Sequence, residues 1–536
     1  MDRGYFIGID VGTGSARAGV FDAAGKMLAV AKRDIALFIQ PGDIAEQSSE
    51  DIWRGVCASV REAVAAAAID PAAIAGIGFD ATCSLVVVGQ GGEPLPVGHS
   101  GDAQRNIIVW MDHRATGQAA RINATGHRVL DYVGGVISPE METPKLLWLS
   151  ENRPQTFASA WQFFDLADYL TWRATGSLSR SICTLTCKWT YLGHEGLWDE
   201  SYFEAIGLGG LAREGFARIG TEVVPGGTAL GQGLLSAAAQ DFGIPAGIAV
   251  GAGLIDAHAG GLGTVGARGG EGTVQSRMAY VMGTSACTMA STTAPAFVPG
   301  VWGPYFSSMV PGLWLSEGGQ SAAGAAMDQL VQYHPSTGEA KRQAAMAGLS
   351  LVAWLAREAE TRGGAAALPA LVGDIHVVPE FLGNRSPFAD PGAKALIAGL
   401  GMDGGLDSLV GLYLAGLAGL GYGARQILAA LGEKGVAIDT VVVSGGAAQS
   451  PLVRQILADA TGVRVAATVS EEPVLLGAAI LGALAAGAFP DAATAMHQMS
   501  EIGQTYEPDS RLANWHQRRM EAFSALQSVG RTLRPT

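Results

Sequence analysis

Cysteine and charged side chains are scarce in this chain of 536 residues. Charged residues make up 16% of it, and only five residues, unevenly placed, are cysteine. A disulfide framework needs paired cysteines and an oxidising compartment, so we expect reduced thiols and a cytoplasmic protein. Cys183 and Cys187 lie close together, but no second pair accompanies them. The spacing therefore argues against a zinc site.

Positive charge and membrane anchors are also lacking. Lys and Arg number 35 against 49 acidic residues, a net charge of −14, which argues against a nucleic-acid-binding surface. Residues 1–4 leave no room for a targeting segment before the first apolar run. The uncharged stretches 408–424 and 473–490 approach the length of a membrane span, but their Gly and Ala content favours buried helices packed on a sheet. We expect neither a nucleic-acid nor a membrane partner.

The most informative stretch is the start of the chain, Ile7-Gly8-Ile9-Asp10-Val11-Gly12-Thr13-Gly14-Ser15. An apolar strand delivers Asp10 into a turn of glycines and hydroxyl residues, and a second apolar strand leaves it. Gly12 and Gly14 allow close backbone approach and positive φ, so the N–H groups of the turn can point at an anion. Asp10 could then hold the metal ion that accompanies phosphates. An ordinary glycine turn between two strands is the alternative.

Apolar periodicity predicts an α/β protein with two domains of similar plan. A chain of 536 residues is too long for one ordinary core, and its 48% hydrophobic residues are typical of a globular protein. The first round has predicted strands at 5–9, 16–21, 27–31, 74–79 and 85–88 and a helix at 51–68; the second has strands at 278–282, 286–289 and 440–443 and helices at 409–431 and 451–460. We place the domains at 1–264 and 265–536, with a helical insertion at 336–369.

Three further glycine-rich turns suit phosphate chemistry. Asp256 follows the turn at 250–253, where a carboxylate could accept a proton from a hydroxyl that attacks a γ-phosphate, or could simply cap the following helix. Gly283-Thr284-Ser285 repeats the plan of the first turn. Ser444-Gly445-Gly446-Ala447-Ala448-Gln449-Ser450 opens a predicted helix and suits a phosphate or a flat base.

Two other nucleotide motifs fit poorly. Residues 261–266 match the dinucleotide pattern literally, but they follow a helix-like stretch, and no acid ends a second strand at the required distance. Lys26 follows a glycine but lacks the hydroxyl and the preceding glycine spacing of a Walker loop. We therefore favour neither a Rossmann nor a P-loop site.

Together these loops resemble the FGGY family of carbohydrate kinases, in the actin, Hsp70 and sugar-kinase superfamily, over nearly the entire chain. Further matching segments are 110–114, 145–149, 165–170 and 318–324; residues 140–142 and Ala418 depart from the usual family spelling. The resemblance implies an α/β fold with two actin-like (ribonuclease H-like) domains and a deep interdomain cleft. Domain 1–264 would mainly bind sugar, and domain 265–536 would mainly bind nucleotide.

The resemblance also implies residue roles. Asp256 would be the catalytic base, and Asp10 would organise Mg²⁺ and the β- and γ-phosphates. ATP would be bound by Asp10, Gly12, Thr13, Arg17, Gly283, Thr284, Gly324, Gly445, Gly446 and Gln449.

The turn at 80–84 bears on the substrate. The Arg-Glu pair expected of glycerol kinases and the Met-His pair expected of xylulokinases are absent there, and Ala81-Thr82-Cys83-Ser84 resembles the ribulokinase-like pentulose kinases; segments 183–191 and 316–320 fit the same group. The expected sugar-binding residues are Ala81, Thr82, Trp110, Lys188, Asp256 and Glu317. Lys188 could donate to sugar oxygens and Trp110 could stack on the sugar, although a solvated lysine and a core tryptophan are the ordinary alternatives.

The sequence thus predicts ATP- and Mg²⁺-dependent phosphorylation of a pentulose, D-ribulose first, with L-ribulose and ribitol as close alternatives. An actin-like ATPase that phosphorylates no sugar is the alternative from a different class. A small-molecule sugar is the expected partner, and a homodimer is compatible with the sequence.

Overall fold

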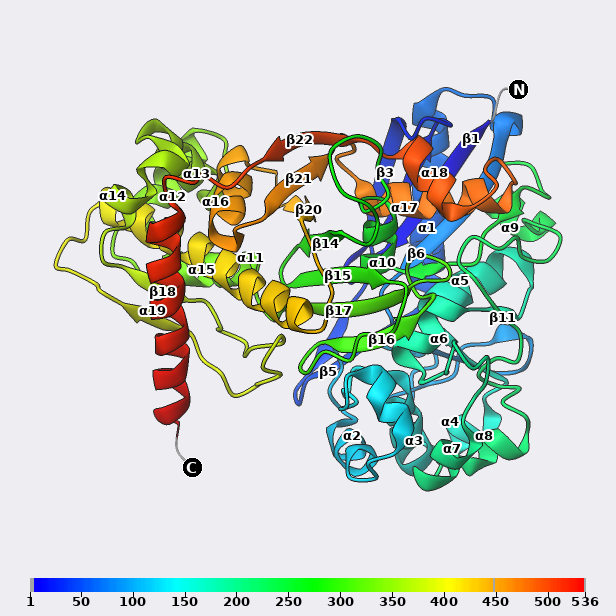
Figure 1. Cartoon of the computed structure of the whole chain (residues 1–536). Helices are drawn as coiled ribbons and strands as arrows, with labels where there is room; N and C mark the ends of the chain where they lie inside the picture. Colours follow the sequence, from blue (N-terminus) through cyan, green and yellow to red (C-terminus); the bar gives the residue numbers. More distant parts are fainter. Residues whose placement is uncertain (1–3, 447–448, 535–536) are drawn as a thin grey trace.

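Two large β-sheets form the centre of the structure, a computed structural model that describes residues 4–446 and 449–534. The first has the strand order β12-β6-β1-β2-β3, with β13 also on β6, and the second has the order β16-β17-β15-β14-β20-β21-β22. In Figure 1 the first sheet lies on the right and the second runs from the centre to the left. Three smaller sheets, β4-β5-β8-β7-β9, β10-β11 and β18-β19, lie outside them.

The elements of the first half of the chain alternate between strands and helices. They are β1 (Tyr5–Val11), β2 (Ser15–Phe21), β3 (Met27–Asp34), β4 (Phe38–Gln40), β5 (Ile44–Gln47), α1 (Ser49–Ala67), β6 (Ile74–Ala81), β7 (Leu85–Val88), β8 (Ile107–Ile108), α2 (Thr116–Asn123), α3 (Glu142–Asn152), α4 (Pro154–Ser159), β9 (Gln162–Asp165), α5 (Leu166–Thr175), β10 (Arg180–Ser181), α6 (Ile182–Lys188), α7 (Glu200–Ala205), α8 (Gly209–Arg213), β11 (Val223–Val224), α9 (Ser236–Phe242), β12 (Ala249–Val250), β13 (Leu254–Ile255) and α10 (Asp256–Leu262). Short 3₁₀ helices add η1 (Pro71–Ala73), η2 (Gln90–Gly92) and η3 (Arg128–Val133).

The second half repeats this alternation and ends on a long helix. Its elements are β14 (Arg277–Met282), β15 (Ala286–Thr292), β16 (Trp302–Phe306), β17 (Trp314–Gln320), α11 (Gly324–Gln332), α12 (Thr337–Met346), α13 (Leu351–Thr361), η4 (Gly364–Ala367), α14 (Leu368–Val372), β18 (His376–Val378), β19 (Leu396–Ala398), α15 (Leu406–Glu433), β20 (Thr440–Ser444), α16 (Pro451–Thr461), β21 (Arg464–Thr468), α17 (Pro473–Ala485), α18 (Ala492–Met499), β22 (Ile502–Tyr506) and α19 (Ala513–Thr532).

The opening strands form the predicted hairpin. β1 and β2 pair antiparallel with Asp10 opposite Arg17, and β6 joins β1 in parallel with Asp80 beside Asp10. All residues of β1 except Tyr5 are buried, as expected of a central strand covered on both faces. The ends of β1 and β6 therefore bring two acidic side chains to one edge of the sheet.

The second sheet repeats the plan of the first. β14 and β15 pair antiparallel, and β20 joins β14 in parallel. A backbone hydrogen bond closes each of the two hairpin turns. The N–H of Gly12 donates to the carbonyl oxygen of Ser15 at 3.0 Å, and the N–H of Gly283 donates to the carbonyl oxygen of Ser285 at 2.9 Å. The predicted repeat of strand, Gly-hydroxyl turn and strand is confirmed.

Helix α17 belongs to the second half of the sequence but packs on the first sheet, where Figure 1 shows it in orange among the blue strands. The approach is close enough to require glycine. A Cβ at Gly8 would lie 2.0 Å from the carbonyl oxygen of Leu475, and one at Gly78 would lie 1.9 Å from that of Ala478. The chain thus crosses from the second half back to the first.

Helix α15 is the one helix, in the part of the chain that the structure describes, that is long and apolar enough to span a membrane. Of its most apolar window, 83% is buried inside the molecule. The interpretation of 408–424 as a buried helix is therefore confirmed. Segment 336–369 is helical as predicted, and its helix α13 packs against α15.

Candidate active site

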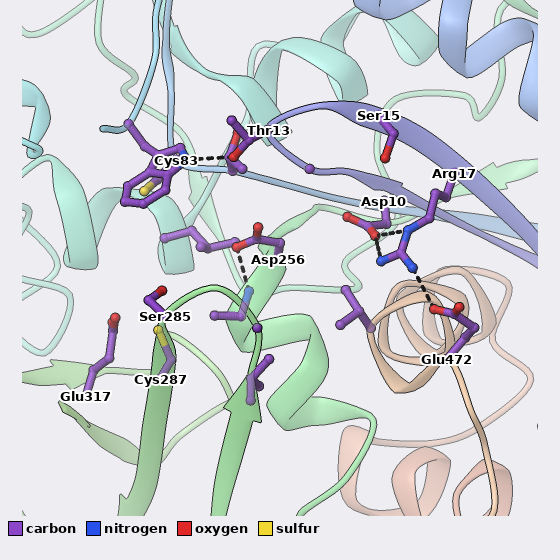
Figure 2. Close-up of a pocket in the computed structure, with 18 of the residues that line it drawn as sticks. Asp10, Thr13, Ser15, Arg17, Cys83, Asp256, Ser285, Cys287, Glu317 and Glu472 are labelled. Atoms are coloured by element: carbon purple, nitrogen blue, oxygen red, sulfur yellow. Dashed lines mark hydrogen bonds and ion pairs between the residues drawn. The ribbon is translucent and has the colours of Figure 1, made fainter. Parts of the chain in front are cut away.

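A cavity of about 590 Å³ lies between the two halves of the chain. Both hairpin turns and the start of α10 border it, so residues far apart in sequence face one space. Of the predicted site residues, it brings together Asp10, Gly12, Thr13, Arg17, Thr82, Trp110, Lys188, Asp256, Gly283 and Glu317. Figure 2 shows Asp10 and Arg17 above the cavity and Ser285 and Glu317 below it, with Asp256 between them.

Asp10 is held by an arginine from the next strand. Nε of Arg17 donates to Oδ2 of Asp10 at 2.8 Å, Nη2 contacts the same oxygen, and Nη1 donates to Glu472 at 2.7 Å (Figure 2). Glu472 is the residue that precedes α17. Arg17 therefore fixes the carboxylate of Asp10 and ties the first hairpin to the helix that crosses back from the second half.

Asp256 begins α10, directly after the short strand β13, and its Oδ1 accepts the N–H of Ala257 at 2.7 Å. Burial, followed by the charge of Asp10, raises the pKa of Asp256 to about 6. Burial and the charges of Asp10 and Asp256 also raise the pKa of Asp80 well above its ordinary value. Three carboxyl groups thus crowd one edge of the first sheet, where like charges oppose ionisation of one another.

The side chain of Trp110 contacts the first hairpin turn. Its indole Nε1 donates to Oγ1 of Thr13 at 3.0 Å, and its backbone N–H donates to Oγ of Ser84 at 3.1 Å. Trp110 is thus a half-buried side chain that lines the cavity, and not the core tryptophan of the ordinary alternative.

Lys188 and Glu317 place opposite charges on the cavity wall. Lys188 is buried, not a solvated surface lysine, and its Nζ lies 5.0 Å from the centre of the Trp302 ring. Burial works against the charge of Glu317, but Lys188 and a hydrogen bond from His258 lower the pKa of this acid to about 2. Nε2 of His258 lies 3.2 Å from Oε2 of Glu317. A charged donor and a charged acceptor therefore face the same space.

Models of the two domains of the FGGY family of carbohydrate kinases match residues 5–263 (N-terminal domain) and 278–486 (C-terminal domain). The chain belongs to the FGGY family of carbohydrate kinases. It is 46% identical over 530 residues to a human FGGY carbohydrate kinase domain-containing protein, covering 97% of this chain and 96% of that protein. It is 37% identical over 517 residues to a protein of Saccharomyces cerevisiae named D-ribulokinase, covering 90% and 72%.

Solved structures agree on the fold of this FGGY kinase. The crystal structure of xylulose kinase from Rhodospirillum rubrum superposes with a TM-score of 0.78 at 21% identity, covering 98% of each chain. The two-domain actin-like α/β fold predicted from the sequence is confirmed, and the protein is a phosphotransferase that acts on a sugar.

Several predicted residues of the FGGY kinase lie outside the cavity. Ala81 ends β6 and is fully buried between Val11 and Ile255, its strand partners. Thr284 is an exposed residue of the second turn itself, and the N–H of Gly324 donates to the carbonyl of Gly283 in that turn at 3.0 Å. The N–H of Gly324 is thus engaged within the protein, and the role of Gly324 in ATP binding stays a prediction.

The last glycine-rich turn borders a separate cavity of about 270 Å³, lined by Gly445 and Gln449. Gly446 is exposed beside it, and residues 447–448 of the predicted motif lie outside the described residues.

In the first turn neither Gly12 nor Gly14 has a positive φ, so that expectation is wrong. The hairpin closes through the bond from Gly12 to Ser15 without a left-handed residue.

Sequence reasoning missed Arg385 and Trp302, which also line the large cavity. Arg385 lies 4.9 Å from the centre of the Trp302 ring, and its Nη1 donates to Sγ of Cys287 at 3.6 Å. The signal that could have found Arg385 is its place in the glycine- and proline-flanked run Gly383-Asn384-Arg385-Ser386-Pro387.

Proposed function

We propose that this FGGY kinase transfers the γ-phosphoryl group of ATP to D-ribulose, giving D-ribulose 5-phosphate and ADP. The observation that carries the proposal is the convergence of Asp256, Lys188 and Glu317 on one cavity between the two halves. A pentulose presents several hydroxyls and a carbonyl, so its site needs matched donors and acceptors. The similarity to the yeast protein named D-ribulokinase supports this sugar.

Asp256 is the proposed general base. Its carboxylate accepts the proton of the sugar hydroxyl while that oxygen bonds to the γ-phosphorus, and the bond from this phosphorus to the β–γ bridging oxygen breaks, releasing ADP. The raised pKa of Asp256, about 6, brings the group closer to the pH at which it must accept a proton. Burial of the site favours attack by the sugar hydroxyl over attack by water.

The carboxyl groups at the end of the first sheet fit Mg²⁺. The side chain of Asp80 is fully buried beside Asp10, and Arg17 engages only Oδ2 of Asp10. Hard oxygen donors are the ligands that Mg²⁺ prefers. Asp10, with Asp80 behind it, would hold the ion, which when bound would neutralise charge on the β- and γ-phosphates.

The nucleotide is proposed to extend towards the smaller cavity. Gly445 and Gln449 line it together with Glu471, which adjoins Glu472 of the large cavity. ATP would therefore contact mainly the second half of the chain.

The five free thiols support the further proposal that the enzyme is cytoplasmic.

A coupled assay of ADP release with D-ribulose, L-ribulose, ribitol and D-xylulose tests the proposal. D-ribulose should give the highest kcat/KM, and Asp256→Asn should lower kcat at least about 100-fold while sugar binding, followed by calorimetry, persists. A higher kcat/KM with L-ribulose or ribitol would replace the proposed sugar. ADP release at an equal rate without sugar would favour the ATPase alternative, and near-normal turnover of the variant would remove Asp256 from its role.

A further inference from the structure

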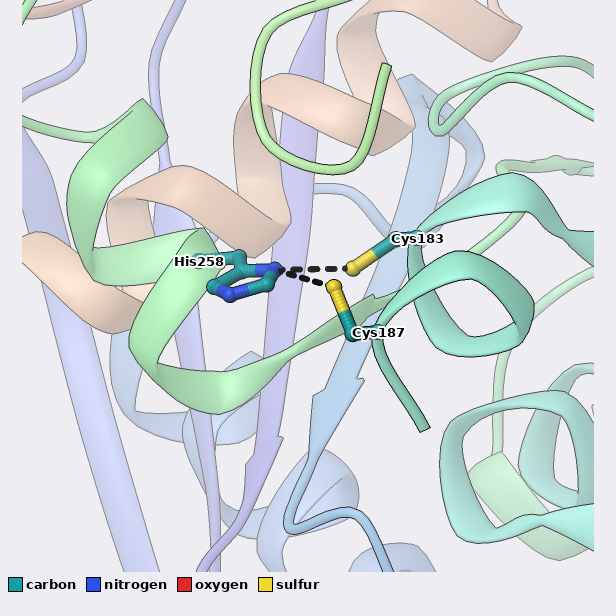
Figure 3. Close-up of side chains that lie close together, drawn as sticks. All are labelled: Cys183, Cys187 and His258. Atoms are coloured by element: carbon teal, nitrogen blue, oxygen red, sulfur yellow. Dashed lines mark hydrogen bonds between the residues drawn. The ribbon is translucent and has the colours of Figure 1, made fainter. Parts of the chain in front are cut away.

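Behind the sugar-facing side of the cavity, two cysteines and a histidine meet. Cys183 and Cys187 lie on α6 and His258 on α10, and Figure 3 shows both sulfurs directed at the same ring nitrogen. Nδ1 of His258 lies 3.1 Å from Sγ of Cys183 and 3.9 Å from Sγ of Cys187, and the three atoms lie within 4.8 Å of one another. All three side chains are at most 1% exposed.

We propose that Cys183, Cys187 and His258 bind a zinc ion. Two sulfurs and one imidazole nitrogen are the donors that Zn²⁺ takes in proteins, whereas Mg²⁺ and Ca²⁺ require oxygen. Zn–S bonds of about 2.3 Å and Zn–N bonds of about 2.0 Å at tetrahedral angles separate sulfur from nitrogen by about 3.5 Å. The two observed distances, 3.1 and 3.9 Å, lie on either side of that value.

Neighbouring groups orient the three ligands. Glu317 lies 3.2 Å from Nε2 of His258. With the proton of the imidazole on Nε2, facing this carboxylate, the lone pair of Nδ1 would be directed at the two sulfurs. A carboxylate on the far nitrogen of a histidine is the usual outer partner of a zinc-bound imidazole. The backbone N–H of Ile255 donates to Sγ of Cys183 at 3.4 Å, a contact suited to a thiolate. Both of these contacts to the ligands, from Glu317 and from Ile255, are already present in the structure.

The charge balance favours a divalent ion. Binding of Zn²⁺ releases two protons from the cluster of Cys183, Cys187 and His258, so the net charge of this buried region does not change. Three protein ligands leave one tetrahedral position for water.

The ion would position two parts of the active site. Cys183 contacts Ile255, the residue before Asp256, and His258 contacts Glu317, an acid of the cavity wall, so the ion would fix both. The metal site itself does not depend on the identity of the sugar.

The test is the metal content of the intact chain expressed in zinc-supplemented medium. Plasma mass spectrometry should find about one zinc per wild-type chain, and Cys183→Ser/Cys187→Ser should retain only a small fraction of it. Cys57→Ser, a buried cysteine on α1, is the matched control and should keep its zinc. Protein grown with Co²⁺ in place of zinc should show a thiolate-to-cobalt charge-transfer absorption that the double variant lacks.

The wild-type measurements decide the proposal even where a variant folds poorly. Wild-type protein without zinc and without the cobalt absorption would overturn it. Zinc content that is unchanged in a folded Cys183→Ser/Cys187→Ser variant would place the ion elsewhere and would also overturn it. Detection of a Cys183–Cys187 disulfide by mass spectrometry of the native chain would replace the metal site with a redox pair.

Discussion

The indole Nε1 of Trp110 donates a hydrogen bond to the hydroxyl oxygen of Thr13 at 3.0 Å. One of these residues was predicted to contact the sugar and the other to contact phosphate, so this bond joins the two parts of the site. Trp110 is fixed in turn by Ser84, from the turn that follows β6. Trp110 therefore links the turn after β6 to the first hairpin turn.

Trp110→Phe and Thr13→Val should each lower kcat/KM for the sugar about fivefold, because each removes a hydrogen bond worth about 1 kcal/mol. The double variant should be little worse than the more damaged single variant, since both substitutions remove the same bond. Initial rates of ADP release for the four proteins give the coupling energy. Fully additive losses would show that the bond contributes nothing to turnover.

Arg17→Gln should damage the enzyme more than Glu472→Gln. Arg17 is the cation that pairs with the buried Asp10, whereas its pair with Glu472 lies at a partly exposed edge. Loss of the arginine leaves buried acids uncompensated, and we expect kcat/KM for ATP to fall at least about tenfold. Because partly exposed pairs contribute little, Glu472→Gln should stay within about threefold of wild type.

Steady-state rates at varied ATP concentrations measure both effects, and circular dichroism checks that each variant is folded. Equal losses in the two variants would contradict this prediction. They would show that the pair of Arg17 with Glu472 matters as much for activity as the pair of Arg17 with Asp10.

His516 should make the fold acid-sensitive. Nδ1 of His516 on α19 lies 3.0 Å from the hydroxyl of Tyr422 on α15, and its Nε2 is buried without a partner among the described residues. Burial and the positive charges of Arg425 and Arg519 lower the pKa of His516 to about 4. The unfolded chain binds a proton near pH 6.5, while the folded chain does so only near pH 4. Stability should therefore fall as the pH drops through this range.

Thermal unfolding of wild type and His516→Gln between pH 7.5 and 4.5 measures this effect. The variant should lose less stability than wild type towards acid, by at most about 3 kcal/mol for this one group. His497→Gln, an exposed position on α18, is the control and should follow wild type. Parallel curves for His516→Gln and wild type would show that His516 does not carry the acid sensitivity.

The parts of the site that the sequence predicted are local. Asp10 lies near the end of a short apolar strand, before a turn, and Asp256 begins a helix directly after such a strand; each pattern is visible within about ten residues. The approach of His258 to Cys183 and of Arg385 to Trp302 depends on the packing of segments far apart in the chain. A search for paired cysteines within one segment could not reveal a histidine contributed by α10.

Local pattern also left some conformations undetermined. Glycine permits positive φ but does not require it, and the turn at Gly12 and Gly14 closes without it. Lys188 sits at the end of the short helix α6, where sequence alone suited a solvated charge equally well; the fold buries it beside Trp302. Burial of this lysine depends on β16, contributed by the other half of the chain.

The crossing of α17 has a consequence for how the molecule is made. Gly8 and Gly78 lie against the backbone of Leu475 and Ala478, and at this contact α17 packs on β1 and β6 of the first sheet. A ribosome must therefore synthesise the chain as far as residue 485 before the earliest strands can complete their core. The first sheet therefore completes its packing only after most of the second half has been synthesised, and cutting the gene between the halves would separate the first sheet from the helix that completes it.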